Sequence, residues 1–368
     1  MRLLISAGGT GGGIYPALAT AQAVRRLVPD AELLWLGGRG GMEEELVPRA
    51  GLPIVSVSAA GMHGVGWRQA PGNAARLLAG TLQAWREIGK FRADVVFTTG
   101  GYLAVPAAAA ARMRGVPLVV YVPDIEPALA ARFAARLARR IAVTADQSAA
   151  YYPKGAPVTV TGYPLREEVR SASRAAGRKA FGIPAEEPVL LAFGGSRGAR
   201  SINRALFRAL PELLEGMHVI HITGTLDWPE VDKVVHELPK WHKARYHAYP
   251  YLHEEMGGAM AAADLAVSRA GASVLGEYPH FRLPSILVPY PHAWKYQKTN
   301  AEYLESQGAA IVLPDESLSE SMAAEVLRLM GTPSRRKDMR DVLEKICQKN
   351  SELKLATEVV EAAKEGPR

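Results

Sequence analysis

The chain has 368 residues, of which 48% are hydrophobic and 22% charged, and its net charge is +7. This length favours two domains over one, and the composition excludes a disordered or fibrous protein. The single cysteine, Cys347, excludes a disulfide framework and indicates a reducing compartment. We expect no membrane-spanning segment, because every long apolar run contains charge, and no signal peptide before the first strand.

The excess positive charge lies in the first half of the chain. Residues 1–163 contain 17 Lys and Arg against 10 Asp and Glu, whereas residues 164–368 contain 27 of each kind. A basic half beside a neutral half indicates an anionic partner for the first half, such as phosphate, nucleic acid or an acidic membrane face. An ordinary solvated surface is the alternative.

Short apolar runs alternate with helical patterns along the first half. The run 2–7 predicts a buried strand, and 15–27 predicts a helix because apolar residues recur at helical spacing. Further strands are predicted at 33–38, 53–58, 95–101, 117–123 and 140–145. This alternation is typical of a parallel sheet with helices on both faces.

The same alternation of apolar runs and helical patterns resumes after residues 161–167. Strands are predicted at 188–196, 218–224, 246–252, 263–271, 284–290 and 309–314. We therefore expect two α/β domains of similar plan, 1–163 and 164–345. The charged segment 346–368 is predicted to form a C-terminal helix, a candidate to pack back on the first domain.

Two glycine-rich turns connect a predicted strand to a predicted helix, GGTGGG at 8–13 and GGSRGA at 194–199. Glycine lets the backbone approach a ligand, and the N–H groups that open the following helix attract an anion. Neither turn fits the Walker pattern or a complete dinucleotide-binding fingerprint. Two such turns at equivalent places in two similar domains indicate one ligand on each side of a cleft.

A third segment, SRAGASVLGE at 268–277, also follows a strand and opens a helix. Its small residues leave a helix N-terminus open to phosphate, and the Glu277 carboxylate could accept both hydroxyls of a ribose. Downstream, Gln297 and Asn300 are three residues apart, so a helix would present both amides on one face. Amides suit sugar hydroxyls because they offer both a donor and an acceptor.

Taken together, these segments resemble the MurG family of glycosyltransferases. The matching segments are GGTGG (8–12), GGY (100–102), TGYPLR (161–166), GGSRGA (194–199), SRAGASVLGE (268–277) and QKTNA (297–301). The resemblance covers residues 1–330 and implies the GT-B fold, in which two doubly wound parallel-sheet (Rossmann-like) domains face a cleft. It further implies inverting transfer of GlcNAc from UDP-GlcNAc to the muramyl hydroxyl of lipid I, giving lipid II for peptidoglycan. No metal, cofactor or nucleic acid is implied.

The resemblance also implies roles for individual residues. Arg166 and Ser196 would hold the diphosphate, Glu277 the ribose, Gln297 the GlcNAc hydroxyls, and His253 the uracil. The full implied donor-binding set is Thr10, Gly11, Gly12, Arg166, Ser196, His253, Arg269, Ala272, Ser273, Val274, Leu275, Gly276, Glu277, Gln297 and Asn300. The implied acceptor-binding set is Gly13, Tyr102 and Asp124, with residues 10–12 bordering the same side.

The chain departs from the family where the chemistry is expected. The family's first turn ends in a histidine that is favoured as the general base, and this chain has Gly13 instead. The family's HEQN stretch reads YVPD at 121–124, and Val274 replaces a usual threonine. The candidate carboxylates for a base are therefore Asp124 and Glu126, and we favour Asp124 because it follows a predicted strand. A plain helix N-cap role for Asp124 stays open.

Residues 62–92 combine Trp67, Leu78, Leu82 and Trp85 with several arginines. This combination suits the anionic inner face of a membrane, where lipid I resides, although a helix packed on its own sheet would also fit. We expect peripheral binding at the cytoplasmic face of the cell membrane.

Two alternatives remain to lipid I transfer. One is a related GT-B glycosyltransferase with a different lipid or small-molecule acceptor, and the other is a catalytically weakened nucleotide-sugar-binding homologue. The altered residues on the acceptor side favour these alternatives, and the retained donor side does not separate them.

Overall fold

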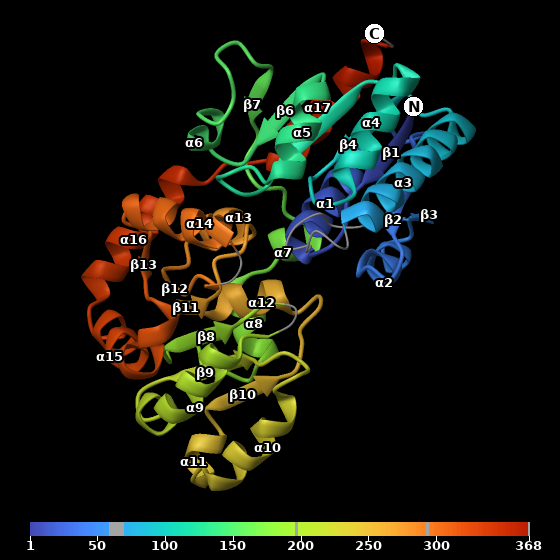
Figure 1. Cartoon of the computed structure of the whole chain (residues 1–368). Coiled ribbons are helices and arrows are strands. Elements are labelled where there is room, and N and C mark those ends of the chain that lie inside the picture. Colours follow the sequence, from blue (N-terminus) through green and yellow to red (C-terminus); the bar gives the residue numbers. More distant parts are fainter. Residues whose placement is uncertain (59–69, 196–197, 292–293, 367–368) are drawn as a thin grey trace. The chain divides into compact units, whose positions relative to one another are not determined.

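The computed structural model describes residues 1–58, 70–195, 198–291 and 294–366 (Figure 1). The chain divides into two compact units. Unit 1 comprises Met1–Arg166 and Gln348–Arg368, and unit 2 comprises Glu167–Cys347.

The described part of unit 1 forms a seven-stranded sheet in the order β3-β2-β1-β4-β5-β6-β7, and every neighbouring pair is parallel. The strands are β1 (Arg2–Ser6), β2 (Glu32–Gly38), β3 (Ile54–Val57), β4 (Val95–Thr98), β5 (Leu118–Val122), β6 (Arg140–Val143) and β7 (Val158–Val160). The helices are α1 (Gly11–Leu27), α2 (Glu43–Arg49), α3 (Ala70–Phe91), α4 (Ala104–Arg114), α5 (Leu129–Leu137), α6 (Asp146–Ala149) and α17 (Ser351–Lys364).

Helices cover both faces of this sheet, and the side chains of each strand alternate between the two faces. Leu3 and Ile5 pack on one face against α1 and α17, whereas Leu4 packs on the other against α3 and α4. The last helix, α17, lies against α1 although it ends the chain (Figure 1), and Arg140 pairs with its Glu358 at 3.0 Å.

The described part of unit 2 forms a six-stranded parallel sheet in the order β10-β9-β8-β11-β12-β13. The strands are β8 (Val189–Phe193), β9 (His218–Ile222), β10 (Tyr246–Tyr249), β11 (Leu265–Ser268), β12 (Ser285–Leu287) and β13 (Ala310–Val312). The helices are α7 (Glu167–Arg170), α8 (Arg174–Ala180), α9 (Arg200–Leu213), α10 (Trp228–Glu237), α11 (Lys240–Lys243), α12 (Met256–Ala262), α13 (Val274–Phe281), α14 (Trp294–Ser306), α15 (Leu318–Met330) and α16 (Pro333–Ile346), with a 3-10 turn at Asp315–Ser317. Two doubly wound parallel sheets are thus confirmed.

Most strands are shorter than the sequence predicted, β7 was not predicted, and two of the differing boundaries lie beside the first glycine turn and Tyr102. The first helix begins at Gly11, because the N–H groups of Gly13 and Ile14 already donate to the carbonyl of Thr10 at 3.1 and 3.2 Å. Strand β4 ends at Thr98 rather than at Gly101, since Gly100 and Gly101 take the left-handed conformation that ends a strand. No helix in the described part of the chain is both long and apolar enough to cross a membrane.

Candidate functional site

The topology of unit 1 brings the residues predicted for the acceptor side to one edge of the sheet. Strands β1, β4 and β5 are neighbours and parallel, so their carboxyl ends lie at the same edge. The first glycine turn follows β1, Tyr102 follows β4, and Asp124 follows β5. The structure thereby brings together three segments that are far apart in sequence.

The first glycine turn is packed against side chains of its own unit. A Cβ placed on Gly8 would lie 2.3 Å from Oε1 of Glu43, and one on Gly9 would lie 3.2 Å from the Tyr102 ring. One on Gly11 would lie 2.8 Å from the ring of Tyr15. Side chains of the same unit therefore lie close around this turn. Sequence reasoning missed Glu43, and its only signal was an acidic residue at the start of a helix.

Gly13 lies in the first turn of α1 beside Thr99, whose hydroxyl donates to the Gly13 carbonyl at 2.9 Å. A Cβ on Gly13 would lie 3.1 Å from the Thr99 Oγ1. That approach is close but involves a hydroxyl that can move, so the backbone leaves room for a side chain at this position with a small shift of Thr99.

Two carboxylates follow β5. Asp124 is half-buried just beyond the end of that strand, and Glu126 forms an ion pair with Arg132 at 3.0 Å. Inside the sheet, Tyr121 bonds with the Thr144 hydroxyl at 2.8 Å, and burial raises the pKa of Tyr121 well above its ordinary value. Tyr121 therefore has a structural role inside the sheet, whereas Asp124 lies beyond the end of β5, at the carboxyl edge of the sheet.

The segment 161–166 contacts the first helix of unit 1, α1. The guanidinium of Arg166 lies 4.4 Å from the centre of the Tyr15 ring, a cation–π contact. The Tyr163 hydroxyl donates to the carbonyl of Gly12 at 3.4 Å. Arg166 is thus held beside the first turn of α1, where an anion would meet both its charge and the helix N-terminus.

In unit 2 the segment 268–277 forms the end of β11, a short loop and the start of α13. Ala272, Val274 and Leu275 are buried, whereas Ser273 and Glu277 are partly exposed. Glu277 lies in the first turn of α13, and its N–H donates to the carbonyl of Ser273 at 2.8 Å. Gly276 lies between them and is also partly exposed.

The side chain of Arg269 is engaged within unit 2. It forms an ion pair with Asp315, donates to the Ser201 hydroxyl at 2.8 Å and to the Val288 carbonyl at 3.1 Å, and lies 5.2 Å from the Tyr290 ring centre. These contacts connect the loops after β11, β12 and β13 with α9. The guanidinium thus stabilises the loop that carries the residues predicted for the donor side.

The two amides on α14 also hold loops. Asn300 is fully buried and donates to the carbonyl of Ala270 at 3.1 Å, while Gln297 accepts the N–H of Tyr290 at 2.9 Å. Both side chains point toward the carboxyl end of the sheet. The sequence prediction of a shared helix is correct, and each amide bonds to a backbone group of a neighbouring loop.

The second glycine turn rests on a buried polar network. Asn203 donates to Asp227 at 2.8 Å and contacts His221 at 3.0 Å, and His221 contacts the Tyr246 hydroxyl at 2.8 Å. Burial lowers the pKa of His221 to about 3, so the imidazole is neutral. Of the remaining predicted residues, Ser196 lies outside the described residues, and His253 is exposed with its ring 4.6 Å from that of Tyr251.

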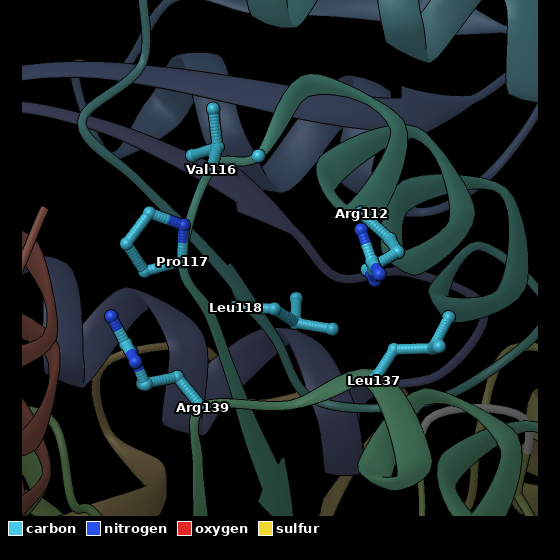
Figure 2. Close-up of a pocket in the computed structure, with 7 residues that line it drawn as sticks. Arg112, Val116, Pro117, Leu118, Leu137 and Arg139 are labelled. Carbon is cyan, nitrogen blue, oxygen red and sulfur yellow. The ribbon is translucent and has the colours of Figure 1, made fainter. Parts of the chain in front are cut away.

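A small pocket lies at the opposite edge of the unit 1 sheet, where β5 begins (Figure 2). It is lined by Arg112, Gly115, Val116, Pro117, Leu118, Leu137 and Arg139. Arg139 pairs with Glu365 near the chain end at 3.1 Å. Because ligands of parallel α/β sheets bind at the carboxyl ends of the strands, this pocket is not the candidate site.

The helix predicted to meet a membrane has two distinct faces within its described part. Ala84 and Ile88 of α3 are buried against the sheet, whereas Leu78 and Leu82 are 68% and 54% exposed. Trp85 is covered by Arg114, whose guanidinium lies 3.6 Å from the ring centre. Residues 62–69 of the predicted segment, with Trp67, lie outside the described residues.

Among the described residues, no group of three or more His, Cys, Asp or Glu side chains could hold a metal ion. Groups that could bind an anion at the two candidate edges include the Arg166 guanidinium and the N-termini of α1 and α13.

Comparison with known proteins gives matches along the whole chain. The family model of the glycosyltransferase family 28 N-terminal domain matches residues 3–143, and that of the C-terminal domain matches residues 189–358. A transferase from Desulforudis audaxviator is 39% identical, covering 92% of each chain, and one from Symbiobacterium thermophilum is 38% identical, covering 99% of this chain and 97% of the relative. Both bear the name UDP-N-acetylglucosamine–N-acetylmuramyl-(pentapeptide) pyrophosphoryl-undecaprenol N-acetylglucosamine transferase. The crystal structure of MurG from Acinetobacter baumannii has a TM-score of 0.76 at 22% identity, covering 98% of this chain and 99% of that one, a likeness of fold.

Proposed function

The chain belongs to the MurG family within glycosyltransferase family 28, and on that premise we propose that it transfers GlcNAc from UDP-GlcNAc to the muramyl hydroxyl of lipid I, giving lipid II. The observation that carries this proposal is the identity of 38% over 99% of the chain with a transferase of that name. The GT-B architecture, with two parallel α/β units, agrees with it.

The donor half of the reaction is assigned to unit 2. Supporting this assignment are Ser273 and Glu277, which are partly exposed at the start of α13, where the helix dipole favours a phosphate. The Glu277 carboxylate would accept the ribose hydroxyls and Gln297 would contact the sugar. Asn300 and Arg269 would act indirectly, because their side chains hold the loops that carry these residues.

The leaving diphosphate needs stabilisation as the sugar–phosphate bond breaks. We assign this role to Arg166 and Ser196 together with helix N–H groups. Arg166 supports the assignment because its guanidinium is held beside the first turn of α1 by Tyr15. A cation fixed in this way needs little reorganisation when charge develops on the phosphate.

In the chemical step, the muramyl hydroxyl attacks the anomeric carbon, the bond to the UDP oxygen breaks, and a base takes the hydroxyl proton. Gly13 has no side chain for that purpose. We assign the base to Asp124, which is half-buried at the carboxyl end of β5, at the same edge as Gly13 and Tyr102. Glu126 is the weaker candidate, since it is paired with Arg132.

Because lipid I is anchored in the membrane, we also propose that unit 1 binds the anionic cytoplasmic face of the cell membrane as a peripheral protein. The exposed Leu78 and Leu82 of α3, with the exposed Arg76 and Arg86 on the same helix, support this docking. The activity would serve peptidoglycan synthesis, and through the cell wall it would affect cell shape and division.

The proposal is tested by incubating labelled UDP-GlcNAc with a short-chain lipid I analogue and measuring labelled lipid II. We expect transfer by the wild type and a loss of about 10²–10⁴-fold in kcat for Asp124→Asn, because a general base contributes a factor of that order. Binding of UDP-GlcNAc by Asp124→Asn should match the wild type. Glu126→Gln is the matched control and should retain transfer.

The variant Gly13→His examines the same assignment from the other side. If Asp124 is the base, a histidine at position 13 adds little, because the proton already has an acceptor. A large rise in kcat for Gly13→His would contradict the assignment to Asp124. Binding of UDP-GlcNAc without transfer to lipid I would contradict the proposed function itself and favour a weakened homologue.

A further inference from the structure

One buried carboxylate connects the loops that form the carboxyl edge of the unit 1 sheet. Glu43, the first residue of α2, has no exposed surface. It accepts the N–H of Gly9 at 3.3 Å, the N–H of Gly38 at 2.9 Å and the hydroxyl of Tyr102 at 3.4 Å. Gly9 and Tyr102 lie in the loops after β1 and β4, and Gly38 is the last residue of β2, so a single side chain joins three strand ends.

The glycines around this carboxylate fit it closely. A Cβ placed on Gly41 would lie 2.4 Å from the Glu43 carboxylate, and one on Gly37 would lie 3.0 Å from its Cγ. A Cβ on Gly38 would lie 2.4 Å from the hydroxyl of Tyr102. Because Gly8 and these glycines have no side chain, the Glu43 carboxylate and the Tyr102 phenol can occupy the space beside them. A buried charge is costly unless it is hydrogen-bonded, so the three donors compensate for its burial.

Tyr102 is held by the same arrangement. Its ring lies against Gly9, and its hydroxyl points at Glu43. Burial, and next the negative charge of Glu43, raise the pKa of Tyr102 to about 12, so the phenol keeps its proton and remains a donor to the carboxylate. The position of the ring is therefore determined by Glu43 and by the glycine turn.

We infer that Glu43 is a positioning residue for the acceptor half of the reaction: it sets Tyr102 and the Gly8–Gly9 backbone in the places that the lipid acceptor must meet. This inference rests on the proposed function. Glu43 does not touch the acceptor, because it is fully buried, and it acts through its three hydrogen bonds. A second consequence is that the Gly9 N–H is already occupied by an internal carboxylate. That N–H is therefore not available to a phosphate of the acceptor.

The neighbouring Glu44 provides a matched control. It accepts the N–H of Gly40 at 3.1 Å and the hydroxyl of Ser56 at 2.7 Å, so it joins the loop after β2 to strand β3, but these bonds are exposed. The two glutamates differ by one position on the same helix. Glu43 meets the glycine turn and Tyr102, whereas Glu44 meets neither.

The test compares Glu43→Gln with Glu44→Gln in steady-state transfer from UDP-GlcNAc to a lipid I analogue. Glutamine keeps the size of the side chain but turns an NH₂ group toward one of the three donors. We expect a loss of roughly 10- to 100-fold in kcat/KM for the acceptor with Glu43→Gln, since a displacement of about 1 Å in a positioning group can cost that much. The KM for UDP-GlcNAc should not change, because the hydrogen bonds of Glu43 go to Gly9, Gly38 and Tyr102, none of which is assigned to the donor, and Glu44→Gln should match the wild type.

The variants Tyr102→Phe and Glu43→Gln/Tyr102→Phe show whether Glu43 acts through Tyr102. Tyr102→Phe alone should lower kcat/KM for the acceptor. The fold-loss in kcat/KM of the double variant should be smaller than the product of the two single fold-losses, as expected for coupled residues. Binding of UDP-GlcNAc by each variant reports that it is folded. Tyr102→Phe keeps the inference testable if Glu43→Gln does not fold.

The outcomes separate the two proposals. A wild-type chain that does not transfer to the lipid I analogue contradicts the proposed function. Wild-type transfer, with Glu43→Gln equal to Glu44→Gln or with equal losses for donor and acceptor, contradicts only the positioning role. Losses confined to the acceptor that are shared by Glu43→Gln and Tyr102→Phe support it.

Discussion

The two glycine turns follow the first strand of their respective sheets and open a helix, yet their glycines serve different purposes. In unit 1, Gly8 makes room for the end of a side chain, the Glu43 carboxylate. In unit 2, a Cβ on Gly194 would lie 2.2 Å from the backbone nitrogen of Ala199, and one on Gly198 would lie 2.3 Å from the carbonyl oxygen of Thr223. The first turn is shaped by side chains and the second by backbone.

This difference determines how each turn responds when one of its glycines is substituted. The far end of a side chain can rotate away, whereas the backbone of a packed α/β unit cannot move without disturbing its sheet. A glycine that faces a side chain is therefore required for a particular arrangement, and a glycine that faces backbone is required for the fold. The following predictions test this distinction, from the largest expected effect to the smallest.

Gly198→Ala should be the most damaging of these changes. Gly198 has a positive φ of 77°, and its Cβ would collide with the Thr223 carbonyl. We expect a loss of about 3–5 kcal/mol in the free energy of unfolding, since a left-handed alanine costs roughly 1–2 kcal/mol and the collision adds a similar or larger amount. Urea unfolding measures it.

Gly182→Ala is the control for that experiment. Gly182 also has a positive φ, 66°, but no described atom lies within 4 Å of the position of its Cβ. It should lose only the conformational part, about 1–2 kcal/mol. Equal losses for Gly182→Ala and Gly198→Ala would show that the contact between backbone atoms is not the deciding feature.

Gly8→Ala should cost less, about 2 kcal/mol, because it displaces the Glu43 carboxylate from its buried hydrogen bonds rather than moving the backbone. The loss should shrink in a Glu43→Ala background, where only the Leu103 side chain, 2.8 Å from the position of the new Cβ, still has to move. Thermal or urea unfolding of the two single variants and the double variant measures this coupling. Additive losses would indicate that the contact with Leu103, and not the one with Glu43, determines the cost.

Acidification should weaken unit 2 rather than unit 1, because every histidine that the structure describes lies in unit 2. Burial lowers the pKa of His221 to about 3 and that of His247 to about 4, so the folded chain keeps both neutral while the unfolded chain binds protons below its ordinary histidine pKa of about 6.5. Stability is therefore lost as the pH falls. We expect a loss of about 1 kcal/mol from His221 between pH 7 and pH 5.5.

The measurement for that prediction is urea unfolding at both pH values. His221→Gln should reduce the difference between the two values, whereas His236→Gln, at an exposed position of α10, should leave it unchanged. The Asp227 carboxylate opposes the effect, because its charge favours protonated His221. A His221→Gln chain with the full wild-type pH dependence would remove His221 as its source.

Several features of the fold could be predicted from the sequence alone. Alternating apolar runs and helical patterns predicted both parallel sheets, because a strand buried on both faces reads as a continuous apolar run. The boundaries were less accurate: α1 begins at Gly11, inside the predicted turn. A glycine-rich sequence does not favour helix, yet the N–H groups of Gly13 and Ile14 bond to the Thr10 carbonyl and start α1 there.

The candidate site could be predicted in part. The pattern at 268–277 indicated the start of α13, and the spacing of Gln297 and Asn300 correctly put both on one helix. The roles that these side chains play were not predictable. Asn300 and Arg269 hold loops through contacts with residues 30 and 46 positions away, and no local pattern encodes such partners.

The sequence by itself determined the class of this protein: two parallel α/β units, two glycine turns after their first strands, and the motifs of a sugar-nucleotide transferase. These are local properties of periodicity, turn chemistry and residue order. The tertiary structure alone decided what the glycines meet. Glu43 is separated from Gly9 by 34 positions and from Tyr102 by 59, and only the parallel order of β2, β1 and β4 brings their ends to one edge, where a buried carboxylate can find its donors.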